Sequence, residues 1–365
     1  MLRDEQKEFN KMRQTQPHKK KGGSYMKKII HYAVIAIILA AMVTPAQGVL
    51  KKTGQTGFQF LKNDMSARSA GMGGAFVMVG SGAAAMFGNP AGLAYVQSGF
   101  DVFATYTPWI ADINYQGAGL VVGLGNLGSV GLNFMTVDYG ESMGTILAPT
   151  ELGYEETGLL DWGGLSVGAA YARRLTDKFI VGVQARYAYQ HLGESFLQTD
   201  TLMSKLGPIT THTVSNEENG VAYELGTIFY PGLFSSFKFG MSIKNFSPTL
   251  TYEEEAFQMP LMFTLGFAVD LFEVLGMGGN NTLLLAVDAL HPRDYTERIH
   301  AGAEFGLMDM AFLRAGYKFN YDIESLSLGG GIKYSLGGIG LKIDAAYSMM
   351  EYFDDVIKFT IGASL

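Results

Sequence analysis

The 365-residue sequence has no cysteine and only six histidines. Without cysteine it can form no disulfide framework and carry no lipoprotein anchor. The histidines are scattered and fit no metal-binding spacing. We therefore expect neither a metal site nor another bound cofactor.

The sequence has only one long apolar run, residues 29–43, and about 15 residues are too few to cross a bilayer comfortably. This run follows the basic Met26-Lys27-Lys28 and precedes the small-residue site Ala46-Gln47-Gly48. Residues 26–48 are thus predicted to be an export signal that is cleaved after Gly48. Residues 1–25 are predicted to be a disordered or non-native leader, and one hypothesis is that Met26 is the true start.

A basic surface is also missing. After Gly48 there are 18 Lys and Arg residues against 31 Asp and Glu, a net charge of −13. Because the basic residues occur singly, nucleic-acid binding is not expected. Hydrophobic residues make up 48% of the chain. With no further long apolar run, a membrane protein of this composition would be a barrel of strands.

What the sequence does contain is a series of segments about ten residues long, rich in Val, Ile, Phe and Tyr and separated by Gly, Asn, Asp and Pro. An even number of such strands is typical of single-chain bacterial barrels. The fourteen predicted strands are 98–107, 113–124, 128–138, 164–175, 178–191, 220–230, 235–245, 260–271, 281–290, 297–307, 310–319, 325–335, 339–349 and 355–365.

Most of these segments alternate between apolar and polar residues. In residues 178–191, Val183 and Tyr187 share one face, and Gln184 and Arg186 share the other. A period of two over ten residues predicts a strand with two unlike faces.

The lengths of the connections separate a membrane barrel from a soluble sandwich. Long connections, 139–163, 192–219 and 246–259, follow odd-numbered strands, whereas those after even-numbered strands are short, apart from 272–280. This asymmetry is typical of outer-membrane barrels. The predicted fold is therefore all-β, a 14-stranded antiparallel transmembrane barrel over residues 98–365.

Residues 49–97, which precede the barrel, are predicted to form a Gly/Ala-rich plug. Residues 68–94 read RSAGMGGAFVMVGSGAAAMFGNPAGLA. Gly71, Gly73 and Gly74 permit conformations that a Cβ would forbid. Ser81 is expected to cap a short helix that ends at Phe87. Asn89-Pro90-Ala91-Gly92 is expected to form a tight turn, with Gly92 left-handed.

Charged residues also occur at inward-facing positions of the strands. Two interpretations remain open for them: a solvated or plug-pairing interior, and a path for a ligand or an anion. The candidate lumen-facing residues are Arg174, Arg186, Lys244, Arg298, Glu304 and Arg314.

Two glycine motifs match the sequence patterns of a catalytic serine and of a phosphate-binding loop, but neither has the structural context that such a site requires. Residues 164–168 match G-x-S-x-G, yet Ser166 lies inside an alternating strand and not in a strand-to-helix elbow. Residues 123–128 match G-x-G-x-x-G, yet a hairpin follows, so they predict a turn. The acidic residues 253–255 are interpreted as a solvated loop, with cation binding as the alternative. No enzymatic activity is expected.

The plug sequence closely resembles the N-terminal signature of the PorV/PorQ family of outer-membrane proteins, which are similar to FadL-type barrels. The signature residues are Arg68, Gly71, Met72, Gly73, Gly74, Asn89, Pro90, Ala91 and Gly92. Further family-like motifs follow in order: AYARRLTDKF at 170–179, SIKNFSP at 242–248, AVD at 286–288, HPRD at 291–294, GAEF at 302–305 and LRAGY at 313–317.

The resemblance implies a Gram-negative outer-membrane protein that assists type IX-like protein export or surface attachment. Its partners would be secretion-system proteins or cargo, besides outer-membrane lipid and lipopolysaccharide. The alternative is a FadL-like transporter of long-chain fatty acids or other hydrophobic compounds. Apolar residues of loop 139–163, among them Met143, Leu152, Tyr154 and Trp162, are compatible with either role.

Overall fold

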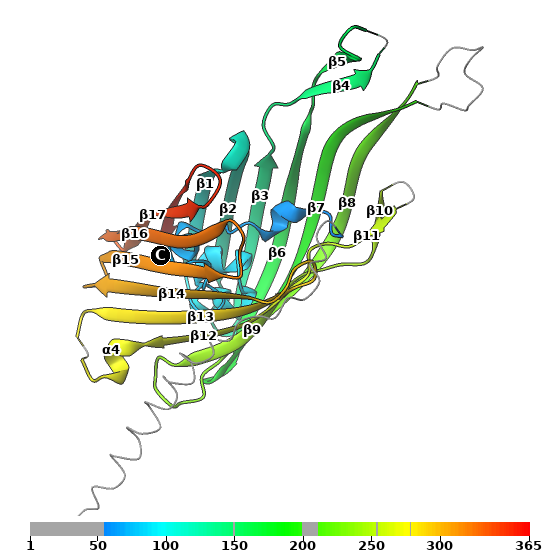
Figure 1. Cartoon of the computed structure of the whole chain (residues 1–365). Coiled ribbons are helices and arrows are strands. Elements are labelled where there is room, and N and C mark those ends of the chain that lie inside the picture. The colour runs from blue at the N-terminus through cyan, green and yellow to red at the C-terminus, as the bar shows by residue number, and fades with distance from the viewer. Residues whose placement is uncertain (1–54, 149, 199–210, 253–254, 278) are drawn as a thin grey trace, which may run out of the picture. The chain divides into compact units, whose positions relative to one another are not determined.

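The computed structural model describes residues 55–148, 150–198, 211–252, 255–277 and 279–365 (Figure 1). The predicted leader, the predicted export signal and residues 49–54 lie outside this part of the chain.

The prediction of a 14-stranded antiparallel barrel is confirmed. The sheet is closed, with the strand order β1-β18-β17-β16-β15-β14-β13-β12-β9-β8-β7-β6-β3-β2. The barrel strands are β1 (Phe100–Pro108), β2 (Asn114–Gly123), β3 (Ser129–Asp138), β6 (Trp162–Thr176), β7 (Phe179–Gln198), β8 (Thr211–Phe229), β9 (Lys238–Phe246), β12 (Met262–Asp270), β13 (Thr282–Pro292), β14 (Arg298–Leu307), β15 (Ala311–Phe319), β16 (Glu324–Leu336), β17 (Ile339–Met350) and β18 (Val356–Ser364).

Alternation places apolar side chains outside and polar ones inside. Val183 is 48% exposed, whereas the next residue, Gln184, is 3% exposed. Val183, on β7, pairs with Tyr171 on β6 and with Leu225 on β8. Both partners are also exposed. Such rows of outward apolar side chains form the surface that faces lipid.

The strands β7 and β8 extend beyond the predicted limits of 191 and 220. Their pairing shifts register between His191 and Glu194 and then continues to the pair Gln198–Thr211. Gly193, with φ of 78°, lies at the shift. This extension was not predicted, because strands that leave the membrane need no apolar face and residues 211–219 show no alternation of that kind.

The long loops contain strands of their own, which were not predicted. Two short hairpins form there, β4 (Met143–Leu147) with β5 (Tyr154–Leu159), and β10 (Leu250–Tyr252) with β11 (Glu255–Phe257). The connection at 272–280 contains the helix α4 (Leu271–Val274), whose Asp270 cap accepts a hydrogen bond from Phe272 N–H. None of the helices in the described residues is both long and apolar enough to cross a bilayer.

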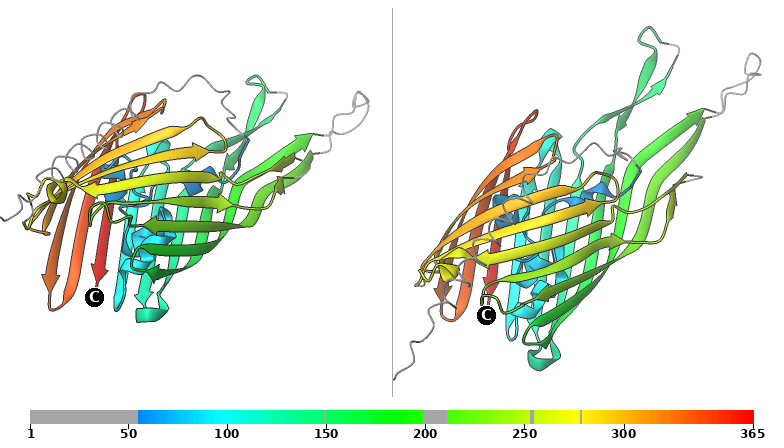
Figure 2. Two further views of the ribbon diagram at one scale, coloured as in Figure 1. Left: turned by 90° about the horizontal axis from the view of Figure 1, so that it is seen from below. Right: turned by 60° about the horizontal axis from the view of Figure 1, so that its bottom comes forward.

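The described residues before β1, 55–99, lie within the barrel, where the strands surround them (Figure 2). These residues form four short helices: η1 (Gln59–Lys62), α3 (Ala67–Gly71), η2 (Gly82–Phe87) and η3 (Pro90–Tyr95). Their apolar side chains form much of the hydrophobic core, so the interior of this barrel is packed.

Three details of the plug differ from the predictions. Ser81 does precede the helix η2, but its side chain makes no capping hydrogen bond. Asn89 begins the helix η3 instead of an isolated turn, and its Oδ1 accepts from Ala91 N–H. Gly92 is not left-handed. It must be small because a Cβ there would lie 2.5 Å from the Gly80 carbonyl oxygen.

Candidate functional site in the barrel lumen

The first half of the plug, residues 68–77, contacts the barrel wall through backbone. A Cβ at Gly73, where φ is 63°, would lie 2.6 Å from Tyr317 N, and one at Gly71 would lie 2.9 Å from Gly329 Cα. The barrel wall also has glycine at the contact, since a Cβ at Gly302 would lie 2.4 Å from Met72 O. Only glycine on both sides permits this approach.

Glycine serves two different purposes in this segment. Gly73 and Gly74 have positive φ, as expected from the sequence, whereas Gly71 does not. Gly71 is needed for the space that it leaves. Gly74 also abuts His300, whose Nδ1 would lie 2.6 Å from an added Cβ.

An ion network fixes this half of the plug to β14, β15 and β17. Arg68 donates two hydrogen bonds to Glu304, from Nε at 2.8 Å and from Nη2 at 2.6 Å. Arg314 donates to the same carboxylate at 2.5 Å and to Asp344 at 2.6 Å. Two-point guanidinium contacts of this kind fix orientation as well as position.

Carboxylates of the wall also accept hydrogen bonds from plug backbone. The buried Asp288 on β13 accepts from Phe76 N–H at 2.7 Å and from Val77 N–H at 2.9 Å. Asp101 on β1 accepts from Ala83 N–H at 2.7 Å. These bonds satisfy donors that would otherwise be unpaired in the interior.

The second half of the plug, residues 86–92, meets hydrogen-bond donors of β7 and β9. Gln184 and Arg186 donate to Met86 O at 3.2 and 3.4 Å. Ser242 donates to Gly88 O at 2.7 Å, and Lys244 donates to Phe87 O. Arg186, 1% exposed, also pairs with Glu224 at 3.3 Å.

The segment Asn89-Pro90-Ala91, at the start of η3, lies on further wall glycines. A Cβ at Gly182 would lie 2.3 Å from Ala91 N, and one at Gly226 would lie 1.9 Å from Asn89 Oδ1. Asn89 Nδ2 donates to Val77 O and to Thr227 O, at 3.0 and 3.2 Å. This asparagine thus joins the two halves of the plug to each other and to β8.

The six candidate lumen residues do not form one site. Glu304 and Arg314 belong to the network with Arg68, and Arg186 and Lys244 bind the second half of the plug. Arg298 stacks between the rings of Tyr295 and Tyr321, at 4.2 and 3.9 Å from their centroids. Arg174 is exposed beside the short turn after β6, over the Tyr230 ring.

Two cavities flank the plug. One, about 280 Å³, is lined by strand residues near the long loops, and we call it the outer chamber. The other, about 260 Å³, is lined by residues near the short turns, including Asp101, Lys342 and Arg314. The plug separates them.

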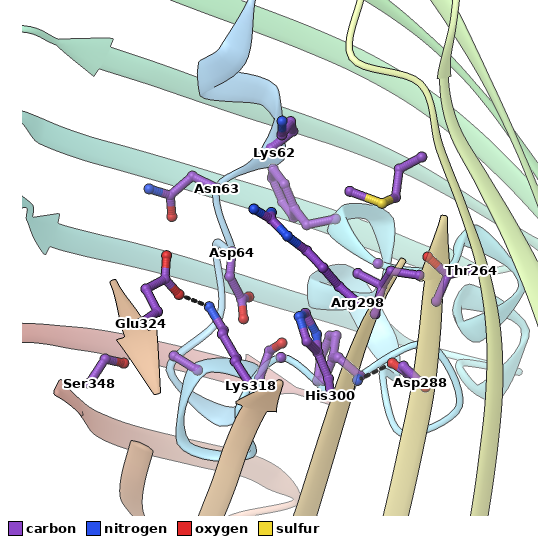
Figure 3. Close-up of a pocket in the computed structure, with 18 of the residues that line it drawn as sticks. Lys62, Asn63, Asp64, Thr264, Asp288, Arg298, His300, Lys318, Glu324 and Ser348 are labelled. Atoms are coloured by element: carbon purple, nitrogen blue, oxygen red, sulfur yellow. Dashed lines mark hydrogen bonds and ion pairs between the residues drawn. The ribbon is translucent and has the colours of Figure 1, made fainter. Parts of the chain in front are cut away.

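Charged, aromatic and aliphatic side chains share the lining of the outer chamber, and Figure 3 labels several of the charged ones. Five are cationic: Lys62, Lys244, Arg298, Lys318 and Lys358. Three are carboxylates: Asp64, Asp288 and Glu324. Trp109, Tyr115 and Tyr321 add aromatic rings. The chamber therefore has a lining of mixed polar and apolar character, with more positive than negative side chains.

The beginning of the described chain is tied to the outer rim of the barrel. Asp294, in the loop between β13 and β14, accepts hydrogen bonds from Thr56 at 2.9 Å, Gln59 at 3.0 Å and Lys62 at 2.7 Å. Burial alone would raise the pKa of Asp294, but these hydrogen bonds and the Lys62 charge hold it below its usual range.

Several anchoring residues were not selected from the sequence, namely Asp101, Gln184, Glu224 and Ser242. Each occupies an inward position of an alternating strand, and an inward carboxylate such as Glu224 was a visible signal. Ser166 lies in β6 without a helix after it, and in the described residues no cluster of three or more His, Cys, Asp or Glu side chains could hold a metal ion.

Several solved structures share this fold. The Pseudomonas putida toluene transporter TodX is 14% identical with a TM-score of 0.55, over 82% of this chain and 97% of that one. The Ralstonia pickettii toluene transporter TbuX is 16% identical with a TM-score of 0.54, over 84% and 99%. A Pseudomonas aeruginosa FadL homologue is 12% identical with a TM-score of 0.51, over 82% and 98%.

No curated protein matches the sequence. The model of one protein family, described as "Type IX secretion system protein PorV", matches residues 47–275. That match includes the whole plug and the strands β1 to β12, which carry the contacts of its second half. The chain is therefore a Gram-negative outer-membrane barrel that belongs to the family of the type IX secretion system protein PorV.

Proposed function

We propose that this protein assists type IX-like export or surface attachment of proteins, and that its partners bind the outer loops. The observation that carries the proposal is the set of eight charged side chains that line the outer chamber. A transporter of hydrophobic compounds needs an apolar pocket on the outer side of its plug. Here charged side chains stand among the apolar ones in that place, in a chain of the PorV family.

The anchored plug supports the same proposal. Ion pairs and hydrogen bonds from β1, β7, β8, β9, β13 and β14 hold it, together with backbone contacts at wall glycines. Moving the plug would leave several buried charges unpaired, which costs several kcal/mol each. A barrel closed in this way presents its loops, and not its lumen, to a protein partner.

The β4–β5 hairpin supplies a suitable contact surface. Its apolar residues Leu152, Tyr154 and Leu159 are exposed, Leu152 by 73%. Exposed glutamates accompany them at positions 141, 151, 155 and 156. Trp162 is not part of this surface, because its Nε1 donates to Gly140 O and its ring packs on Tyr139. Apolar side chains within an acidic surround are typical of interaction sites.

Deleting the gene tests the proposal. We expect cargo to accumulate in the periplasm, while growth on hydrophobic substrates stays unchanged. The second candidate, a hydrophobic-compound transporter, is favoured by the shared fold with toluene transporters. A deletion that spares the secreted proteins and abolishes growth on a hydrophobic substrate would establish that alternative.

A point variant tests the contact surface. Leu152→Ser should reduce cargo export, whereas Leu233→Ser, also exposed but in the turn between β8 and β9, should not. Contacts through the glutamates should also weaken once added salt shortens the Debye length below about 10 Å. A complex that is insensitive to salt and to Leu152→Ser would place the interface elsewhere.

A further inference from the structure

Three cations of the outer chamber have no acidic partner. Within the described residues, Lys244, Arg298 and Lys358 make no salt bridge with a carboxylate, although Lys358 is only 2% exposed. The other two cations of the chamber are paired, Lys62 with Asp294 and Lys318 with Glu324. An unpaired buried charge is costly, so the three must be compensated in another way.

Neutral groups compensate them only in part. Lys244 donates to Phe87 O, and Lys358 donates to Asn63 Oδ1 at 3.2 Å. Arg298 lies between two tyrosine rings, and its buried Nε has no hydrogen-bond partner among the described residues. A lysine has three donors and an arginine five, so donors remain for another molecule.

The carboxylates of the chamber do not balance this charge. Asp288 already accepts two backbone N–H groups of the plug, and Glu324 pairs with Lys318. Asp64 projects into the same space as Arg298 and Lys318 (Figure 3), and its Oδ1 accepts from Ser66 N–H. Asp64 and Glu324 act electrostatically on Lys358, and Glu224, which is paired with Arg186, acts on Lys244. None of these carboxylates forms a salt bridge with the three cations.

We propose that the outer chamber binds an oxyanion, a phosphate, sulfate or carboxylate group, through Lys244, Arg298 and Lys358. Arg298, fixed by Tyr295 and Tyr321, would offer its planar fork, and the lysines would supply point charges. The cavity of about 280 Å³ leaves room for such a group and for part of the molecule that carries it.

The anion would enter from the outer side of the membrane. The chamber lies toward the long loops, and the plug separates it from the cavity near the short turns. A free ion, a lipid headgroup and a carboxylate at the end of a chain share the required chemistry. The site is independent of the proposed export role, since neither requires the other.

The test uses the full chain, refolded in detergent, and titrates it calorimetrically with inorganic phosphate, with acetate and with a short-chain phosphatidylglycerol. At least one probe should bind with a stoichiometry of one. Arg298→Gln and Lys358→Gln should each weaken that binding at least tenfold, because each removes a charge-assisted hydrogen bond. Inorganic phosphate binding most tightly would indicate a free ion, and the lipid binding most tightly would indicate a headgroup.

Two further variants separate the site from general electrostatics. Lys178→Gln makes the same change of charge at an exposed turn and should leave the affinity unchanged. Ser348→Tyr fills the chamber without changing any charge and should abolish binding. Heat-modifiable gel mobility identifies which variants fold. The absence of saturable binding to the folded wild-type chain, or binding that survives Ser348→Tyr and both glutamine variants, would overturn the proposal.

Discussion

The two halves of the plug are bound by wall regions of opposite character. Residues 68–77 present a cation and backbone N–H groups to carboxylates, Glu304 on β14 and Asp288 on β13. Residues 86–92 present carbonyl oxygens to donors on β7 and β9, such as Gln184 and Ser242. The plug therefore has one favourable orientation, because sliding or rotating it would bring donors to donors and acceptors to acceptors.

Among substitutions that test this difference between the two halves, we expect the largest loss of stability at Glu304. Glu304→Ala removes the acceptor shared by Arg68 and Arg314 and leaves two cations without it. Breaking a buried ion pair on one side costs about 3–5 kcal/mol, so we expect a loss of that size in the free energy of unfolding. Urea titration in lipid vesicles measures it. Glu156→Ala, on the exposed strand β5, is the matched control and should change stability little.

Steric contact in the first half is tested at Gly73. Gly73→Leu would force a side chain onto the backbone of β15 and should cost about 1–3 kcal/mol from overpacking, beyond the strain of its positive φ. The difference in gel mobility between unheated and heated samples of this variant should decrease. Gly153→Leu has the same sign of φ, 78°, but nothing lies within 4 Å of its Cβ, so it isolates the strain. Equal effects of the two substitutions would show that Gly73 is not packed against the wall.

The second half should be less sensitive to single substitutions, because its donors are several. Ser242→Ala removes the hydrogen bond to Gly88 O while Lys244, Gln184 and Arg186 remain. We expect a loss of about 1 kcal/mol in the free energy of unfolding, the usual value for one hydrogen bond. A loss as large as that of Glu304→Ala would contradict the difference between the halves.

The smallest effect should appear at the outer rim, as a dependence on pH. Because the pKa of Asp294 is below its usual range in the folded chain, Asp294 stabilises the fold above its unfolded pKa of about 4. That contribution is lost as the pH falls through the lower, folded pKa. In Asp294→Asn it should be absent at every pH. The stability difference between the two proteins, measured by urea titration, should therefore vanish in acid; a constant difference would exclude a role for the Asp294 charge.

The sequence predicted the barrel well and the lumen less well, for a physical reason. Each barrel strand has a lipid face and an inner face, so apolar and polar residues alternate with a period of two over about ten residues, as in 178–191. The partner of an inward residue depends on strand register and on the path of the plug, neither of which is local. The pairing of Arg68 with Glu304 spans 236 positions and could not be read from either residue.

Family resemblance identified the plug residues without their roles. Glycine is required at positions 71 and 92 because backbone atoms approach these residues closely. Neither residue has a positive φ that would itself favour glycine. The β4–β5 hairpin and the extensions of β7 and β8 were missed because strands in water, with both faces exposed, show no apolar alternation.

The plug also determines the order in which this protein assembles. Residues 56–77 are synthesised before every barrel strand, yet many of their partners lie on β13 to β18, which are synthesised last, and the Thr56–Asp294 hydrogen bond spans 238 positions. Contacts between such distant residues form slowly. The first strand also pairs with the last, β1 with β18. Closure of the sheet and docking of the plug must therefore be one late event, and a barrel that closed around an empty lumen would have to reopen to admit it.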